Sequence, residues 1–206
     1  MPVMGAGTGR MIAFVLMVFM GCSGGGGGGS SSGGGISSGL SGNFAPDTSP
    51  SCPSAPDTLS MRKQSVNGRI VTIGIQATDC DGSMGVYGVN FEVSFDPSVA
   101  QCATSNPCSA GTLLSDPLAT PTPVCTCDNS SGQLLGSFSR KSPGTNQSVT
   151  GSADIARFAL EIIRAGSGRV DFLNTEDING TALITLNGSP VAITGLSYPG
   201  GAALGQ

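Results

Sequence analysis

Seven cysteines carry the most reactive side chains of this 206-residue chain, which contains no histidine and no tryptophan. Cys22 stands apart from the other six and follows an apolar block at residues 11–20, with Arg10 before the block and Gly21 after it. A charged residue, a short apolar run and a small residue are typical of a secretory signal peptide. The run is too short to cross a bilayer, which requires about 20 apolar residues. We therefore expect export, with cleavage next to Cys22.

The residues around Cys22 resemble the signal of bacterial lipoproteins. The sequence Phe-Met-Gly-Cys at 19–22 matches that signal except at Phe19, where the family usually has leucine. The resemblance implies that Cys22 is diacylated and anchors the chain to a membrane of the bacterial cell envelope. An ordinary signal peptide with a cysteine nearby by chance is the alternative. Ser23, rather than an aspartate, favours the outer membrane under the sorting rule of enteric-type bacteria.

The other six cysteines lie in the part of the chain that would be exported. An even number of cysteines in an exported domain predicts disulfides, each of which contributes about 2–4 kcal/mol. The sequence does not choose among the many pairings, although Cys102 and Cys108 could pair easily, and Cys125 and Cys127 would share one face of an extended segment. A thiolate zinc site is disfavoured because its usual C-x-x-C pairs are missing. The candidates are Cys52, Cys80, Cys102, Cys108, Cys125 and Cys127.

Composition argues against catalysis and against nucleic-acid binding. Without histidine, the chain cannot form a Ser/His or Cys/His nucleophile and lacks the commonest metal ligand. Nine Lys and Arg against thirteen Asp and Glu give a net charge of −4, so no basic face is expected for phosphates. A glycosidase needs two suitably spaced carboxylates, and the sequence indicates no aromatic subsite beside such a pair. We predict no enzyme activity, no cofactor and no nucleic-acid partner.

Two acidic stretches, residues 79–82 and 176–180, place carboxylate and amide oxygens beside a glycine. Neither matches the calcium-binding loop that ends in a bidentate glutamate. Asp and Asn side chains commonly bond to their own backbone in turns, and this explains both stretches without an ion. No metal site is predicted.

Composition divides the chain into four parts. Residues 1–21 form the signal peptide. Residues 22–57 form the lipidated cysteine and a Gly/Ser/Pro-rich tether, whose disordered Gly/Ser part reaches roughly 25 Å. Residues 58–197 alternate apolar and polar side chains and are numerous enough for one domain with its own core. Residues 198–206 are expected to form a flexible tail.

The clearest strand pattern lies at residues 86–95. Its apolar positions are Val89, Phe91, Val93 and Phe95, and its polar positions are Asn90, Glu92 and Ser94. This alternation predicts a half-buried strand, which ends at Asp96-Pro97 because proline cannot donate to a ladder. Other strands are expected at 58–63, 71–77, 133–139, 170–173, 181–186 and 191–196, and residues 106–128 are expected to form a long loop pinned by disulfides. Residues 153–163 fit both a helix and a strand, and periodicity alone favours the helix.

Residues 85–99 resemble the third strand of cohesin domains. In that family a glycine-containing lead-in precedes an alternating strand, which is followed by an aromatic-Asp-Pro turn, here at residues 95–97, and by an apolar residue such as Val99. The order of the other segments fits over residues 58–197. Cohesins are nine-stranded jelly-roll sandwiches, so the resemblance implies an all-β sandwich of about nine strands. It also makes residues 153–163 a strand, against the periodicity.

The resemblance also implies a function, because cohesins dock a calcium-loaded dockerin on one sheet face. It places Asn90, Glu92 and Ser94 on that face, although Gly88 stands where a hydrogen-bonding side chain is usual, and a merely solvated strand face is the alternative for these positions. We predict a membrane-anchored, extracytoplasmic, non-catalytic module that binds a dockerin-type protein or a polysaccharide. A structural component of the envelope without a ligand of its own is the alternative.

Overall fold

The computed structural model describes residues 39–47, 52, 56–115, 124–140 and 145–206. Among these residues there is no helix long and apolar enough to cross a membrane. They form fifteen β-strands: β1 (Gly42–Pro46), β2 (Thr58–Asn67), β3 (Ile70–Thr78), β4 (Gly85–Val86), β5 (Gly88–Phe95), β6 (Ala100–Cys102), β7 (Cys108–Ala110), β8 (Val124–Asp128), β9 (Gln133–Ser139), β10 (Gln147–Ser148), β11 (Ser152–Ile162), β12 (Gly166–Leu173), β13 (Ala182–Asn187), β14 (Ser189–Ala192) and β15 (Gly201–Gly205).

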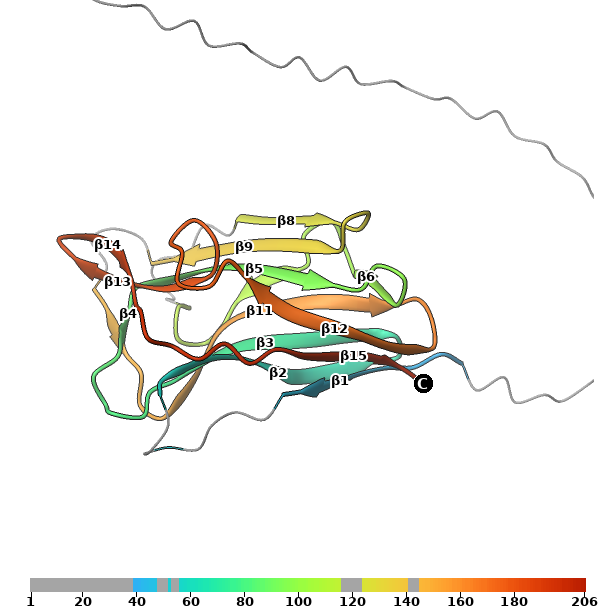
Figure 1. Ribbon diagram of the computed structural model, residues 1–206, viewed down its shortest axis with the longest axis horizontal. Helices are drawn as coiled ribbons and strands as arrows, with labels where there is room; N and C mark the ends of the chain where they lie inside the picture. The colour runs from blue at the N-terminus through green and yellow to red at the C-terminus, as the bar shows by residue number, and fades with distance from the viewer. Residues whose placement is uncertain (1–38, 48–51, 53–55, 116–123, 141–144) are drawn as a thin grey trace, which may run out of the picture. The chain divides into compact units, whose positions relative to one another are not determined.

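Two antiparallel sheets form a sandwich (Figure 1). The first sheet has eight strands, which run in the order β8–β9–β5–β12–β15–β1, and β13 with β14 continues along β5 beyond the end of β12. The second sheet contains β2, β3 and β11, and the short strands β6 and β7 both pair with β11. Strands β4 and β10 form a separate pair. The predicted all-β sandwich is confirmed, and several of its strands are short pieces of two to four residues.

The core is built around β5, whose apolar positions all point between the sheets as the alternation predicts. The Phe91 ring lies 6.2 Å, centroid to centroid, from Phe138 on β9 and 6.2 Å from Phe158 on the second sheet. A Cβ atom at Gly136 would lie 2.1 Å from Phe91 Cζ, so only glycine leaves room for this ring. Aromatic contact across the two sheets therefore fixes how they pack.

Residues 152–162 form the strand β11, as the cohesin resemblance implied. The ladder between β11 and β3 contains a bulge between Asp154 and Ala156, and both Ile155 and Ala156 are fully buried. A bulge places two successive residues against one and so breaks the strict alternation. This irregularity explains why the periodicity of the segment also fitted a helix.

The terminal segments differ from the prediction. Strand β15 lies within residues 198–206, which were expected to form a flexible tail, and β1 lies within the expected tether. The two strands pair along their whole length, from Gly42 with Gly205 to Pro46 with Gly201. Phe44 and Ala203 are 1% and 2% exposed. The domain therefore includes both segments, whose Gly- and Ala-rich sequences carry little strand signal.

The predicted long loop at residues 106–128 is also only partly a loop, because β7 and β8 lie within it. Strand β8 pairs with β9 and forms the edge of the first sheet. The expectation that disulfides pin this region is confirmed. Short, cysteine-bearing strands at an edge lack the long apolar alternation by which strands are recognised.

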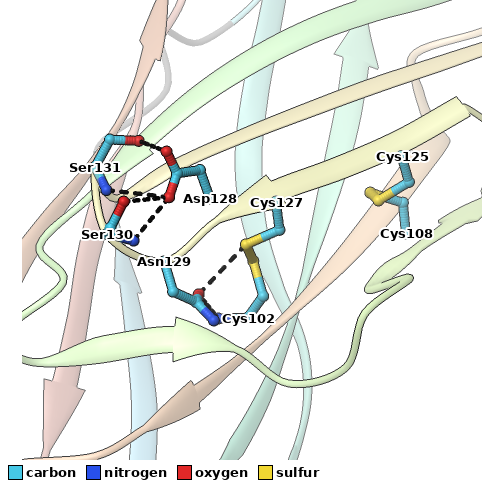
Figure 2. Close-up of a disulfide and its surroundings, with 8 residues drawn as sticks. All are labelled: Cys102, Cys108, Cys125, Cys127, Asp128, Asn129, Ser130 and Ser131. Atoms are coloured by element: carbon cyan, nitrogen blue, oxygen red, sulfur yellow. Dashed lines mark hydrogen bonds between the residues drawn. A yellow bond between two sulfur atoms is a disulfide. The ribbon is translucent and has the colours of Figure 1, made fainter. Parts of the chain in front are cut away.

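Three disulfides use all six candidate cysteines: Cys52–Cys80, Cys102–Cys127 and Cys108–Cys125. The easy pairing of Cys102 with Cys108 does not occur. Cys102 lies opposite Leu160 of β11 and Cys108 lies opposite Phe158, so both cysteine side chains face the interior rather than each other. Cys125 and Cys127 share a face of β8, as expected, and two bridges join β8 to the second sheet (Figure 2).

Removing one inter-sheet bridge should destabilise the sandwich. We expect the double substitution Cys102→Ala with Cys127→Ala to lower the free energy of unfolding by about 2–4 kcal/mol, because the unfolded chain gains freedom. Urea denaturation of the two proteins measures this difference. Peptide mapping of the unreduced wild type is the control and should recover the three stated pairs. Free thiols or a Cys102–Cys108 peptide would contradict the account.

Candidate functional site

The predicted partner-binding residues Asn90, Glu92 and Ser94 all lie on the outer face of β5 and are half-buried. They share this face because successive side chains of a strand point to opposite sides. Leu135 and Ser137 of the neighbouring strand β9 lie on the same face. The structure therefore brings the three predicted residues together on one surface of the first sheet.

All three residues form hydrogen bonds with other parts of the chain. The Asn90 side-chain oxygen accepts a hydrogen bond from Ser137 Oγ at 2.6 Å, and its amide nitrogen donates to the backbone oxygen of Ile178 at 2.5 Å. Glu92 Oε2 accepts a hydrogen bond from Asn174 Nδ2 at 2.5 Å. Ser94 donates to the backbone of the next strand, β12. Asn90 and Glu92 thus hold one segment of the chain against the sheet.

This segment, residues 174–181, is called the covering loop below. Strands β12 and β13 share one edge of β5, and the chain leaves that edge after Leu173, opposite Glu92, and returns at Ala182, opposite Asn90. The base of the loop is closed by the Thr181 N–H, which donates to the backbone oxygen of Asn174 at 2.9 Å. In Figure 1 the loop is the orange-red excursion between β12 and β13. It interrupts the pairing along this edge of β5.

Two shallow hollows lie on the outer face beside the covering loop. One, of about 260 Å³, is lined by Val124 of β8, by Leu135 and by Ile178 of the loop. The other, of about 320 Å³, is lined by Tyr87, Ser139 and Pro190 together with loop residues. Both include Asn90, Ser137, Ile178 and Asn179, and none of the described residues that line them is charged. Such a surface suits neutral and aliphatic groups of a ligand.

The sequence analysis did not identify several residues of this surface. Val124 is 59% exposed and Leu135 is 42% exposed. The neighbouring leucines 134 and 135 carried a signal, because one of two adjacent side chains in a strand must point outward. Val124 was hidden within the expected loop. Ile178 and Asn174 could not be placed, because the sequence does not reveal onto which face a loop folds.

A group of three acidic residues lies elsewhere, near the Cys52–Cys80 bridge, with carboxylate oxygens of Asp57, Asp79 and Asp81 within 4.8 Å of one another. The Asp79 carboxylate accepts the backbone N–H groups of Asp81, Gly82 and Met84, and Asp57 accepts that of Cys80. The bonds of Asp79 are turn bonds, as the sequence analysis expected for residues 79–82. Asp57, which that interpretation did not include, bonds to this turn from the segment before β2. In the second acidic stretch, Asp177 caps its own turn by accepting the Asn179 N–H.

The turn between β8 and β9 is closed by Asp128 (Figure 2). Its carboxylate accepts the N–H and O–H of Ser130 and the O–H of Ser131. These hydrogen bonds, first from the Ser130 side chain and then from Ser131, lower the pKa of Asp128 from 3.8 to about 2. The next residue, Asn129, accepts the Cys102 N–H at 2.8 Å. The turn thereby orders the edge of the first sheet beside the Cys102–Cys127 bridge.

Cys22, the predicted lipidation site, lies outside the described residues. The remaining predicted residues are all placed: three on the outer face of β5 and six in disulfides.

Comparison with solved structures identifies the fold. The second type II cohesin module of a cellulosomal adaptor scaffoldin from Acetivibrio cellulolyticus matches with a TM-score of 0.52 and 18% identity, over 71% of this chain and 95% of that one. Type II cohesin A11 from Bacteroides cellulosolvens matches with 0.51 and 17%, over 70% and 96%. A type II cohesin-X-dockerin complex from A. cellulolyticus includes a chain that matches with 0.51 and 18%, over 68% and 92%.

No family model and no curated protein matches the sequence. At these identities the solved structures show the fold alone. The described domain is thus an all-β sandwich with the cohesin fold, as the resemblance of residues 85–99 implied.

The Asp128 turn allows a direct electrostatic test. We expect the Asp128 carboxyl to titrate near pH 2 in the folded protein, and the substitution Ser131→Ala to raise its pKa towards 3.8. Because the folded pKa is the lower one, the stabilisation is present above the ordinary value and is lost as the pH falls towards 2. Side-chain carbon NMR during an acid titration measures the pKa. A wild-type value near 3.8 would show that the turn bonds do not form in solution.

Proposed function

We propose that this chain is a lipid-anchored, extracytoplasmic docking module that binds a dockerin-type protein through the outer face of β5 and does not catalyse a reaction. The observation that carries the proposal is a cohesin fold whose outer sheet face presents exposed Leu135 and Val124 beside neutral hollows. Exposed aliphatic residues gathered on one sheet face are typical of protein interaction sites. One similar structure is a type II cohesin solved in a cohesin-X-dockerin complex.

The surface suits a protein partner for two further reasons. The hollow beside Leu135 is shallow and lined mainly by aliphatic groups and backbone, which suits one or two side chains of a partner rather than an enclosed small molecule. The surrounding outer face carries Glu92 on β5 and Asp128 at the end of β8. A complementary partner would therefore present aliphatic side chains with basic residues around them.

A polysaccharide is the second candidate ligand. The hollow of about 320 Å³ combines the Tyr87 side chain with the hydroxyl and amide groups of Ser137, Ser139 and Asn179, and its described lining residues are uncharged. Neutral sugars are bound by such groups, but a single tyrosine offers a small stacking surface. A structural role without a ligand is the third candidate, and it is favoured if neither class of ligand binds.

The proposed location rests on the sequence. Cys22 would carry the lipid in the bacterial cell envelope, on the outer membrane if the Ser23 rule applies, and residues 23–41 would link it to β1. In the domain, Ser41 is hydrogen-bonded to Gln206. Figure 1 shows this end of the sandwich opposite the β13–β14 hairpin.

Docking can be tested with any dockerin-type modules that the source genome encodes. We expect one of them to bind the domain in calcium and to be released by EDTA, and the substitution Leu135→Asp to weaken binding at least tenfold, as at a buried interface residue. Isothermal titration calorimetry measures both effects.

Ile70→Asp is the matched control, because Ile70 is 39% exposed but lies on the second sheet. Retention of full affinity by Leu135→Asp, or equal losses in the two variants, would contradict docking on this face. Retention of the wild type on a polysaccharide column, with no module bound, would favour the sugar ligand.

The lipid anchor is tested separately. In cells grown with a labelled fatty acid, the wild-type chain should acquire the label and the Cys22→Ser variant should not. A cysteine introduced at position 32 of that variant should fail to restore labelling, because acylation depends on the residues before the cysteine. Label that persists without Cys22 would overturn the assignment.

A further inference from the structure

The covering loop occupies the face on which the proposed function places the partner. Asn90 uses its amide to hold the backbone of Ile178, and Glu92 uses a carboxylate oxygen to hold Asn174. These are two of the three residues predicted to contact a partner. A partner that approaches the sheet therefore meets residues 174–181 of this chain before it can reach Asn90 or Glu92.

The loop is fastened by few and mainly polar contacts. Besides the bonds to the side chains of Asn90 and Glu92, Glu176 Oε1 accepts the Gly195 N–H at 2.7 Å. At the base of the loop, Thr181 Oγ1 accepts the Glu92 N–H at 2.9 Å and donates to the Glu92 backbone oxygen at 3.1 Å. All three disulfides lie elsewhere, and residues 174, 175, 176, 177 and 179 are exposed. Ile178 is the half-buried residue at the centre of the loop. Contacts of this kind open locally at a much smaller cost than global unfolding.

Empty space borders the loop on more than one side. The hollows of about 260 and 320 Å³ lie on the side of β9 and β5. A third, of about 490 Å³, separates Thr175, Glu176 and Asp177 from Pro190 and Val191 of the β13–β14 hairpin. The loop is therefore not packed into the domain as the strands are, and it has room to move away from the sheet.

The backbone of the loop is also strained. Asn174 and Glu176 have φ angles of +47° and +64°, and among the described residues they are the ones other than glycine with positive φ. Asparagine adopts left-handed backbone readily, but for a glutamate it is unfavourable and persists only where surrounding contacts hold it. Release of the loop would relieve this strain at Glu176. At the base of the loop, a Cβ on Gly180 would lie 2.5 Å from Asn174 Cβ, so the two ends of the loop lie very close together there.

We propose that the covering loop is a gate for the docking face: in the free protein it occupies the outer face of β5, and a partner binds only molecules in which the loop has left Asn90 and Glu92. This proposal rests on the docking function proposed above and adds its regulation. Thr181, whose hydroxyl bonds to the Glu92 backbone, and Ala182, which pairs with Asn90, are fully buried and stay on β5, so the moving part begins at Asn174 and ends at Gly180.

The gate has a measurable consequence for affinity. When only a fraction of molecules can bind, the apparent dissociation constant is raised by the inverse of that fraction. A substitution that loosens the loop without touching the strand should therefore strengthen binding. This is the opposite of what is expected when a contact residue is removed.

The test uses the Asn174→Ala variant, which removes the bond to Glu92 and places an alanine in left-handed backbone. Hydrogen exchange by NMR reports opening through three backbone amides: Gly180 and Thr181 of the loop, and Gly195, which donates to Glu176 of the loop. In the wild type we expect these amides to open at least tenfold more often than those of β5. In the variant their exchange should rise about fivefold further, while β5 amides stay unchanged.

Asn187→Ala is the matched control, since Asn187 is an exposed asparagine at the end of β13. It should leave exchange and binding unchanged. With a calcium-loaded dockerin module that binds the wild type, Asn174→Ala should raise the affinity about threefold to fivefold in calorimetry. Wild-type loop amides that exchange as slowly as those of β5, or an affinity unchanged in Asn174→Ala, would overturn the gate. Absence of any bound module would instead overturn the proposed function, and the exchange data remain independent of it.

Discussion

The pairing of β5 along both of its edges is the constraint on which the rest of the structure depends. One edge is taken by β9, and the other is divided between β12 and β13. This pairing fixes the strand at the centre of the first sheet. Phe91 then contacts the rings of Phe138 and Phe158 in the core. Asn90 and Glu92 lie on the outer face. Core packing and the candidate site are therefore two sides of the same strand.

The division of one edge between two strands is what creates the covering loop. Had β12 continued past Leu173, the outer face would be a flat strand surface, and Asn90 and Glu92 would face solvent. Instead, the ladder stops at Leu173, opposite Glu92, and resumes at Ala182, opposite Asn90. Asn174 and Ile178 of the intervening loop bond to the side chains of Glu92 and Asn90. The same interruption produces the hollows beside Ile178, so the shape of this surface follows from the topology of the sheet.

The sequence predicted the strands with long alternating patterns, and it did not predict several short strands. The pattern of residues 86–95 predicted both the buried and the outward positions of β5, and the predicted strand at 133–139 coincides with β9. Strands β1, β8 and β15 were missed, because glycine, alanine and cysteine give little apolar alternation. Disulfide formation followed from the cysteine count, but the pairing of four of the six cysteines depended on β6 and β7 of the second sheet lying beside β8. The loop over Asn90 is a tertiary contact that no local pattern records.

The central claim is that the outer face of β5 receives a protein partner. Chemical-shift mapping of the labelled domain, titrated with a calcium-loaded dockerin module, tests it most directly. The account predicts that shifts concentrate on amides of β5, β8 and β9 and on residues 174–181, while those of β2 and β3 stay in place. Shifts confined to the outer face of the second sheet, or none at saturating module, would contradict it.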